Sequence, residues 1–204
     1  MTIPSLENVR PEASDRDAYG ALDALISNVP AGAKGLVFLP YFAGAGTPRW
    51  NADARGVLAG LTFSHDKGCV ARAFMEGISM EVRDMIETFC RAGITIHNVR
   101  IMGGATRSPV WNQLQADIYN RPVATLKTSD AAVYGAAICG GVGTGIFQEI
   151  KDGVSAMVSI DANYHPLQEN VPVYDELYQT FCQMVESLDE GGLFTSIAGM
   201  QDKV

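Results

Sequence analysis

Cysteine is scarce in this sequence, and its cysteines do not stand at the short spacings that mark metal sites. The four are Cys69, Cys90, Cys139 and Cys182, with no CxxC pair among them. Structural zinc sites use such spacings, and disulfide-rich secreted domains have far more cysteine for their length, so the sequence argues against both. His65, His97 and His165 also lack a Cys or His partner at ligand spacing. We therefore expect reduced, mostly buried thiols in a cytoplasmic protein, and no metal ion bound by protein side chains.

Basic residues are outnumbered: the 204 residues include 15 Lys and Arg against 23 Asp and Glu, for a formal net charge of −8. Nucleic acids and anionic membranes attract a basic face, so we expect neither partner. The longest apolar stretch, residues 131–146, is rich in glycine and shorter than the roughly 20 residues that cross a membrane. Residues 1–14 lack the basic start and apolar run of a signal peptide. A composition with 47% apolar and 19% charged residues is that of a globular protein.

Two widespread nucleotide-binding sequences are missing as well. No GxxxxGK[ST] loop occurs, which excludes a P-loop enzyme. Gly103-Gly104 does not extend into a GxGxxG fingerprint, because a side chain stands at the third glycine position. A Rossmann-type oxidoreductase would also need a ribose-binding acid about 20 residues after the glycines. Asp117 is closer than that and falls in an expected helix, so this alternative is disfavoured.

What the sequence does contain is an alternation of helical and strand-like segments. Apolar spacing and segment length predict helices over residues 17–27, 67–91, 109–119, 131–141 and 171–188. Short apolar runs predict strands at residues 36–40, 57–63, 99–102 and 122–127. The remaining segments are expected to be a flexible lead-in over 1–16, an irregular stretch over 148–170 and a frayed tail over 189–204. The alternation predicts a layered α/β domain over residues 17–188.

The longest expected helix, residues 67–91, has apolar residues at spacings of three and four. They are Val70, Phe74, Ile78, Val82, Met85, Ile86 and Phe89. This stripe predicts the buried face of the helix. The charged residues fall mostly on its other sides, at Arg72, Glu76, Glu81, Arg83 and Asp84. Gly93 is placed to end the helix as its C′ residue. We expect Glu76, and Asp117 in a later helix, to be structural carboxylates that bond backbone or arginine.

One segment carries most of the functional information. Residues 99–102 form a short apolar strand that runs into Gly103-Gly104-Ala105, and Ser108-Pro109 then opens a helix. Serine is a favoured N-cap, and proline suits the first helical position. Adjacent glycines leave backbone amides that a flat or anionic ligand can approach. The segment predicts a nucleotide-contacting corner, although a glycine pair on its own more often marks a tight turn without a ligand.

Four motifs, in order along the chain, resemble those of the FGGY carbohydrate kinases. The segment at 103–123, GGATRSPVWNQLQADIYNRPV, resembles that family's GGGxxSxxWxQxxADxxxxPV. Upstream, residues 39–56 resemble its PYxxGxxTPxWxxxARG loop, and residues 71–77 resemble its ARAxxEG helix. Downstream, residues 130–137 resemble its EAAALGAA helix. His65 points to the xylulokinase-like branch, whereas the GAGTP of the loop is closer to the glycerol-kinase style.

The resemblance implies an actin-like, ribonuclease-H-like α/β fold, with a mixed sheet flanked by helices. It implies that ATP lies between two such domains and that this chain corresponds to the C-terminal one. Gly103, Gly104 and Ala105 are then expected to lie against the adenine and ribose, with Ser108 near the base. The helix over Asp130–Ala137 corresponds to the family's helix at the inter-domain hinge, where small side chains let two helices slide.

Transfer of a phosphoryl group to a sugar needs a phosphate and magnesium cradle, a carboxylate that takes the hydroxyl proton, and a sugar pocket. In the FGGY family all three precede the region that this chain resembles. The resemblance therefore implies the ATP/adenine-binding half of a carbohydrate kinase, with D-xylulose as the favoured sugar and no catalytic residue of its own. ATP or ADP would bind directly, while Mg2+ and the sugar would be held through the N-terminal half.

By itself the chain should then not phosphorylate a sugar, and a homodimer is compatible with this function. A different class of function stays open: a non-catalytic nucleotide-binding or dimerisation module descended from a sugar kinase.

Overall fold

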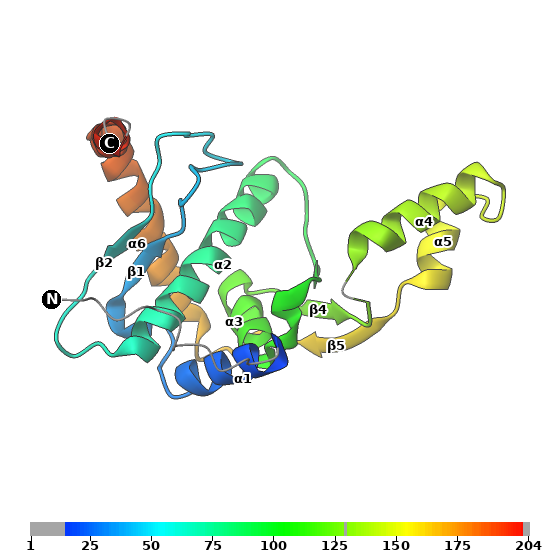
Figure 1. Ribbon diagram of the computed structural model, residues 1–204, viewed down its shortest axis with the longest axis horizontal. Coiled ribbons are helices and arrows are strands. Elements are labelled where there is room, and N and C mark those ends of the chain that lie inside the picture. The colour runs from blue at the N-terminus through cyan, green and yellow to red at the C-terminus, as the bar shows by residue number, and fades with distance from the viewer. Residues whose placement is uncertain (1–14, 129, 202–204) are drawn as a thin grey trace, which may run out of the picture.

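Helices and short strands alternate along the chain in the computed structural model, which describes residues 15–128 and 130–201 (Figure 1). The elements are α1 (Asp15–Ile26), η2 (Ala33–Gly35), β1 (Val37–Leu39), β2 (Val57–Ala59), α2 (Lys67–Arg91), β3 (Val99–Ile101), η3 (Gly104–Arg107), α3 (Pro109–Tyr119), β4 (Val123–Leu126), α4 (Ala131–Gly143), α5 (Ile150–Met157), β5 (Ile160–Tyr164), α6 (Val171–Glu190) and α7 (Leu193–Gln201). Most of the expected lead-in lies outside the described residues, and α1 already begins at Asp15. Within the described part of the chain, no helix has both the length and the apolar character needed to cross a membrane.

The main sheet is mixed and has the strand order β3-β4-β5. β3 runs parallel to β4, with Val99 opposite Val123, and β5 runs antiparallel to β4, with Tyr164 opposite the same valine. β1 and β2 form a separate antiparallel pair. All residues of β4 are buried, whereas β3 and β5 are partly exposed. β4 is therefore the central strand of this sheet. It aligns β3, the strand that leads to the predicted corner.

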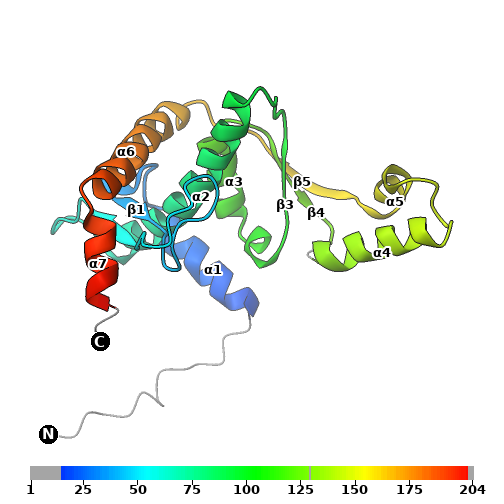
Figure 2. The ribbon, with the colours of Figure 1, turned by 90° about the horizontal axis from the view of Figure 1, so that it is seen from above.

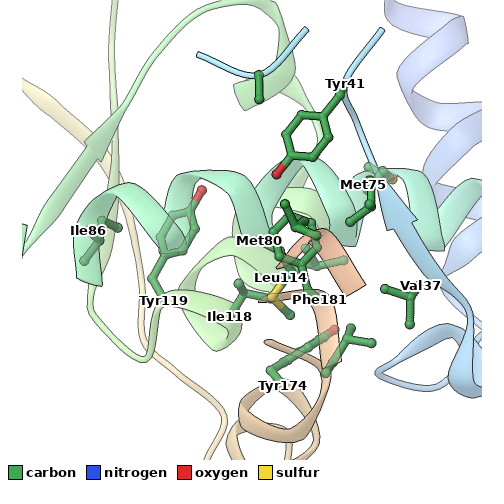
Figure 3. Packing of buried hydrophobic residues seen from close by; sticks show 14 of the residues in the cluster. Val37, Tyr41, Met75, Met80, Ile86, Leu114, Ile118, Tyr119, Tyr174 and Phe181 are labelled. Carbon is green, nitrogen blue, oxygen red and sulfur yellow. The ribbon is translucent and has the colours of Figure 1, made fainter. Parts of the chain in front are cut away.

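The hydrophobic core surrounds α2, which packs against α1, α3, α6 and β1. Figure 3 shows Met80 of α2 close to Leu114 of α3 and Phe181 of α6, and Met75 and Tyr174 belong to the same buried cluster. Burying an apolar side chain of this size stabilises a fold by roughly 1.5–3 kcal/mol. The core therefore holds α3, and with it the predicted corner, firmly against α2.

Both ends of α2 carry local signals, and the helix begins and ends where the sequence predicts. Asp66 is the N-cap, and its carboxylate accepts a backbone N–H of the first turn at 2.9 Å. Gly93 has a φ of 88° and donates its N–H to the carbonyl of Cys90 at 3.0 Å. The N–H of Ile94 reaches the carbonyl of Phe89 at 3.0 Å. These two bonds form the Schellman ending that a C′ glycine favours.

The predicted buried face of α2 is wrong in part. Ile78 and Phe89, from the expected apolar stripe, are 40% and 47% exposed, whereas Arg72, Glu76 and Asp84 are buried. Arg72 forms an ion pair with Glu76, and Asp84 forms one with an arginine of the loop before β2. Charged groups can be buried when they are paired and hydrogen-bonded. The apolar pattern does not record such pairing, so it missed the buried charged residues and included two exposed apolar ones.

Gly77 lets β1 pack directly onto α2, because a Cβ there would lie only 2.3 Å from the carbonyl oxygen of Phe38. We expect Gly77→Ala to lower the free energy of unfolding by about 1–3 kcal/mol, since the two backbones must move apart. Urea denaturation measures the change. Gly135→Ala in α4 is the matched control: nothing lies within 4 Å of its added Cβ, so alanine should stabilise that helix by about 0.5–1 kcal/mol. Equal losses in both variants would contradict the close-packing argument.

Two segments that were expected to lack regular structure are ordered, so those predictions are wrong. The stretch at residues 148–170 contains α5 and β5. Glu149 and Asp152 form a capping box at the start of α5, in which the Glu149 N–H donates to Asp152 Oδ2 at 3.1 Å. The expected frayed tail forms α7, with Phe194 and Ala198 buried. β5 pairs with β4, and α7 packs on α6. β4 lies far from β5 in the sequence, and a turn separates α7 from α6. Local sequence patterns therefore did not indicate either contact.

α4 and α5 form an arm that extends away from the body of the protein (Figures 1 and 2). The thirteen residues of α4 include no charged residue, and Val133 is 59% exposed. Gly135 and Gly140 have open space where a Cβ would lie. Small residues such as these favour close packing of a helix against a neighbour. For these two glycines the described part of the chain supplies no such neighbour.

Candidate nucleotide-binding corner

The backbone of the predicted corner turns sharply between β3 and α3. Gly103 follows β3 and has a φ of 99°, a conformation that residues with a side chain rarely adopt. Thr106 closes the turn, because its N–H and its hydroxyl donate to the Gly103 carbonyl oxygen at 3.2 and 2.7 Å. Gly104 is exposed and Ala105 is half-buried. The corner therefore presents bare backbone to solvent at Gly104.

Ser108 anchors this corner from the protein side. Its Oγ accepts the N–H of Trp111 at 3.0 Å, and Pro109 occupies the first helical position, so the predicted N-cap is confirmed. The Ser108 hydroxyl donates to Oδ1 of Asp23 in α1. Its backbone N–H donates to the carbonyl of Ala105 at 3.1 Å. The residue is fully buried, so its hydroxyl is engaged inside the protein.

Asn112 ties the corner to the main sheet. Its side-chain amide donates to the carbonyl of Thr106 at 2.9 Å and to the hydroxyl of Tyr164, in β5, at 3.3 Å. The residue is fully buried, where hydrogen bonds hold their partners in one arrangement. The turn from Gly104 to Arg107 is consequently fixed on its inner side and open on its outer side.

A buried polar network joins α2 to α6. Arg72 Nε lies 2.8 Å from Glu76 Oε1, and its Nη2 donates to the hydroxyl of Tyr174 at 2.8 Å. That hydroxyl and the N–H of Gly32 each donate to the same glutamate oxygen at 3.0 Å. Burial raises the pKa of the Glu76 carboxyl, while the Arg72 guanidinium opposes the rise. Arg72 and Glu76 stand four residues apart, a spacing that favours an ion pair on a helix. The spacing does not indicate that the pair is buried.

The two carboxylates predicted to be structural both have structural partners, which confirms that prediction. Glu76 belongs to the buried network. Asp117 accepts the N–H of Leu167 at 2.8 Å and the side-chain amide of Asn170 at 2.7 Å, so it attaches the segment before α6 to α3. In the ranges that the structure describes, no three His, Cys, Asp or Glu side chains converge as they would around a metal ion.

A match to a protein family identifies the family of this chain. Residues 4–144, which include the corner, match the C-terminal domain of the FGGY family of carbohydrate kinases. The chain belongs to this family. The resemblance that the four motifs carried is thereby confirmed, and the Rossmann-type alternative is excluded.

The FGGY chain is similar to kinases of more than one sugar. It is 34% identical over 177 residues to a xylulose kinase of Staphylococcus epidermidis, covering 87% of this chain and 36% of that protein. It is 33% identical over 187 residues to a gluconokinase of Bacillus licheniformis, covering 91% of this chain and 36% of that protein. The chain thus spans about a third of the length of these relatives. The identities are almost equal, so they establish the family and leave the sugar open.

A solved relative has the same architecture. The crystal structure of the xylulose kinase from Rhodospirillum rubrum superposes with a TM-score of 0.77 and 34% identity, covering 91% of this chain and 36% of that one. This agreement confirms the predicted fold class: an actin-like α/β domain with a mixed sheet flanked by helices.

The structure brings the four predicted site residues, Gly103, Gly104, Ala105 and Ser108, together in one turn. Their contact with a nucleotide stays a prediction. Sequence reasoning missed Asp23, which lies 85 residues before Ser108 and accepts its hydroxyl. No motif in the sequence marks that aspartate.

Proposed function

We propose that this FGGY chain is the ATP-binding, C-terminal half of a carbohydrate kinase. The backbone of Gly103, Gly104 and Ala105 lies against the adenine and ribose, and Ser108 fixes the turn beneath the base. One observation carries the proposal: an exposed glycine turn, fixed on its inner side by Ser108 and Asn112, in a chain of this family. Bare backbone permits close approach of a flat base, and a turn that is already ordered costs less to fix on binding.

The proposed reaction is transfer of the γ-phosphate of ATP to a sugar or polyol hydroxyl. The N-terminal half supplies the carboxylate that accepts the hydroxyl proton, and it holds Mg2+ together with the phosphates of the nucleotide. D-xylulose is the proposed substrate, supported by the xylulose kinases among the relatives and solved structures. Gluconate is its main competitor, because a gluconokinase is almost as similar.

The exposed surface of the α4–α5 arm supports the proposal that an N-terminal half of the kinase packs against this chain. Val133 is exposed, and Gly135 and Gly140 face open space. A cluster of exposed apolar surface is typical of a face that another protein surface covers. We propose that the N-terminal half covers α4, which places the arm at the boundary between the two halves.

Separate measurements of nucleotide binding and of sugar phosphorylation test this division of roles between the two halves. We expect the purified 204-residue chain to bind ADP–Mg2+ and yet to leave D-xylulose unphosphorylated, because it holds neither the carboxylate nor the sugar pocket. Titration calorimetry measures the binding, and a coupled assay for ADP release measures the turnover. Sustained, sugar-dependent ADP release by the chain alone would contradict the proposal.

The exposed face of α4 equally favours a second candidate, a non-catalytic module that pairs with another copy of itself. This function predicts a dimer in analytical ultracentrifugation and no turnover when the N-terminal half of a xylulose kinase is added. A dimer that does not bind ADP would support the module and overturn the kinase proposal. Turnover that appears on mixing the halves would support the kinase.

A further inference from the structure

Asp23 connects a helix outside the FGGY motifs to the proposed nucleotide corner. α1 packs against both η3 and α3, as Figure 2 shows where it passes beside the start of α3. From this helix, Oδ1 of Asp23 accepts the hydroxyl of Ser108. Asp23 is half-buried, so water competes only weakly for this bond.

α1 is itself held in place by the buried network. Arg72 Nη1 donates to the carbonyl of Val29 at 2.8 Å and to that of Ile26, the last residue of α1, at 3.5 Å. Glu76 and Tyr174 hold the same guanidinium. Arg72 therefore holds the end of α1 to the ion pair of α2, and the same helix carries the aspartate that bonds the corner.

The link from Ser108 to the exposed turn is short. The backbone N–H of Ser108 donates to Ala105, and its Oγ accepts from Trp111, so the residue couples the last turn of η3 to the first turn of α3. Without Asp23 the buried hydroxyl loses its acceptor, and an unsatisfied buried donor is costly. Ser108 would then rotate or admit water, and Ala105 and Gly104 would shift with it.

We propose that Asp23 is a positioning residue for nucleotide binding: through Ser108 it holds the backbone of Gly104 and Ala105 in the arrangement that accepts adenine. This inference rests on the proposed function, because it concerns the same corner. Asp23 touches no ligand itself and acts only on the shape of the turn.

Asp23→Ala tests the role. We expect ADP–Mg2+ to bind about tenfold more weakly, the size of effect that loss of one hydrogen bond to a charged group produces. We also expect faster amide hydrogen exchange at residues 104–108. Asp23→Asn should restore most of the affinity, because its amide oxygen can still accept the Ser108 hydroxyl. Ser27→Ala is the matched control: this exposed hydroxyl, directly after α1, donates to the backbone carbonyl of Asp23 rather than to its carboxylate, so affinity should stay unchanged.

A double variant shows whether Asp23 acts through Ser108. In the Ser108→Ala background, adding Asp23→Ala should change the ADP affinity by less than twofold, whereas independent effects would multiply and contradict the mechanism. Unchanged ADP affinity and amide exchange in Asp23→Ala alone would overturn the positioning role and leave the proposed function intact. Failure of the unaltered chain to bind ADP would overturn the proposed function, and the positioning role with it.

Discussion

Replacing Gly104 with valine is expected to abolish ADP binding while the domain stays folded. Gly104 is exposed at the tip of the corner, so a branched side chain meets solvent in the free protein. In the complex the same side chain would occupy the space that the adenine and ribose need, and we expect a loss of at least about 100-fold in affinity, or roughly 3 kcal/mol. Titration calorimetry with ADP–Mg2+ measures the binding, and the thermal midpoint reports the folding.

Gly46→Val is the matched control for that experiment. Gly46 lies in the loop before β2, is exposed, and has nothing within 4 Å of an added Cβ. The same change in side chain should leave ADP binding unaltered at this position. Undiminished binding by Gly104→Val would show that the nucleotide does not lie against the corner, and it would remove the main support for the proposed site.

Replacing Arg72 with methionine is expected to destabilise the fold by about 3–5 kcal/mol at neutral pH, the usual cost of breaking one side of a buried ion pair. The change leaves the Glu76 carboxylate buried without its cation, and the carbonyls of Ile26 and Val29 lose a donor. Urea denaturation at neutral pH measures the loss. Arg91→Met is the control, since Arg91 is exposed and lies 3.9 Å from its acidic partner. A similar loss in the control would contradict the special role of the buried pair.

The destabilisation of Arg72→Met should also depend on pH. Burial already raises the pKa of Glu76 above its ordinary value of 4.5, and removing Arg72 removes the main opposing influence. The folded variant then binds the proton more tightly than the unfolded chain does. Its free energy of unfolding should therefore fall as the pH rises from about 4.5 towards the raised pKa. A variant whose stability stays flat between pH 4.5 and 7 would show that Glu76 remains ionised without its partner.

Helices with local signals at their ends were predictable from the sequence. Asp66 and Gly93 mark the two ends of α2, and Ser108-Pro109 marks the start of α3. These caps act within one helical turn, so the residues that decide them are neighbours in the sequence. The corner was predictable for the same reason, because its glycines and its serine cap lie within six residues.

Features that depend on distant partners were not predictable in the same way. α2 buries Arg72 and Glu76 because Tyr174 and Gly32 complete their hydrogen bonds, and neither stands near them in the sequence. β5 is a strand because β4 offers it an antiparallel edge. The Asp23 acceptor of the Ser108 hydroxyl belongs to a different helix altogether. Each case needs the three-dimensional fold before the interaction can be recognised.

If the N-terminal half covers the α4–α5 arm as proposed, the arm ties the stability of this domain to that contact. A partner that binds only the folded form adds to its stability by mass action, in proportion to the logarithm of the partner's free concentration. Without that cover, the exposed Val133 and the open glycine positions of the arm would be accessible to proteases. Contact with the N-terminal half would then protect the arm from proteolysis.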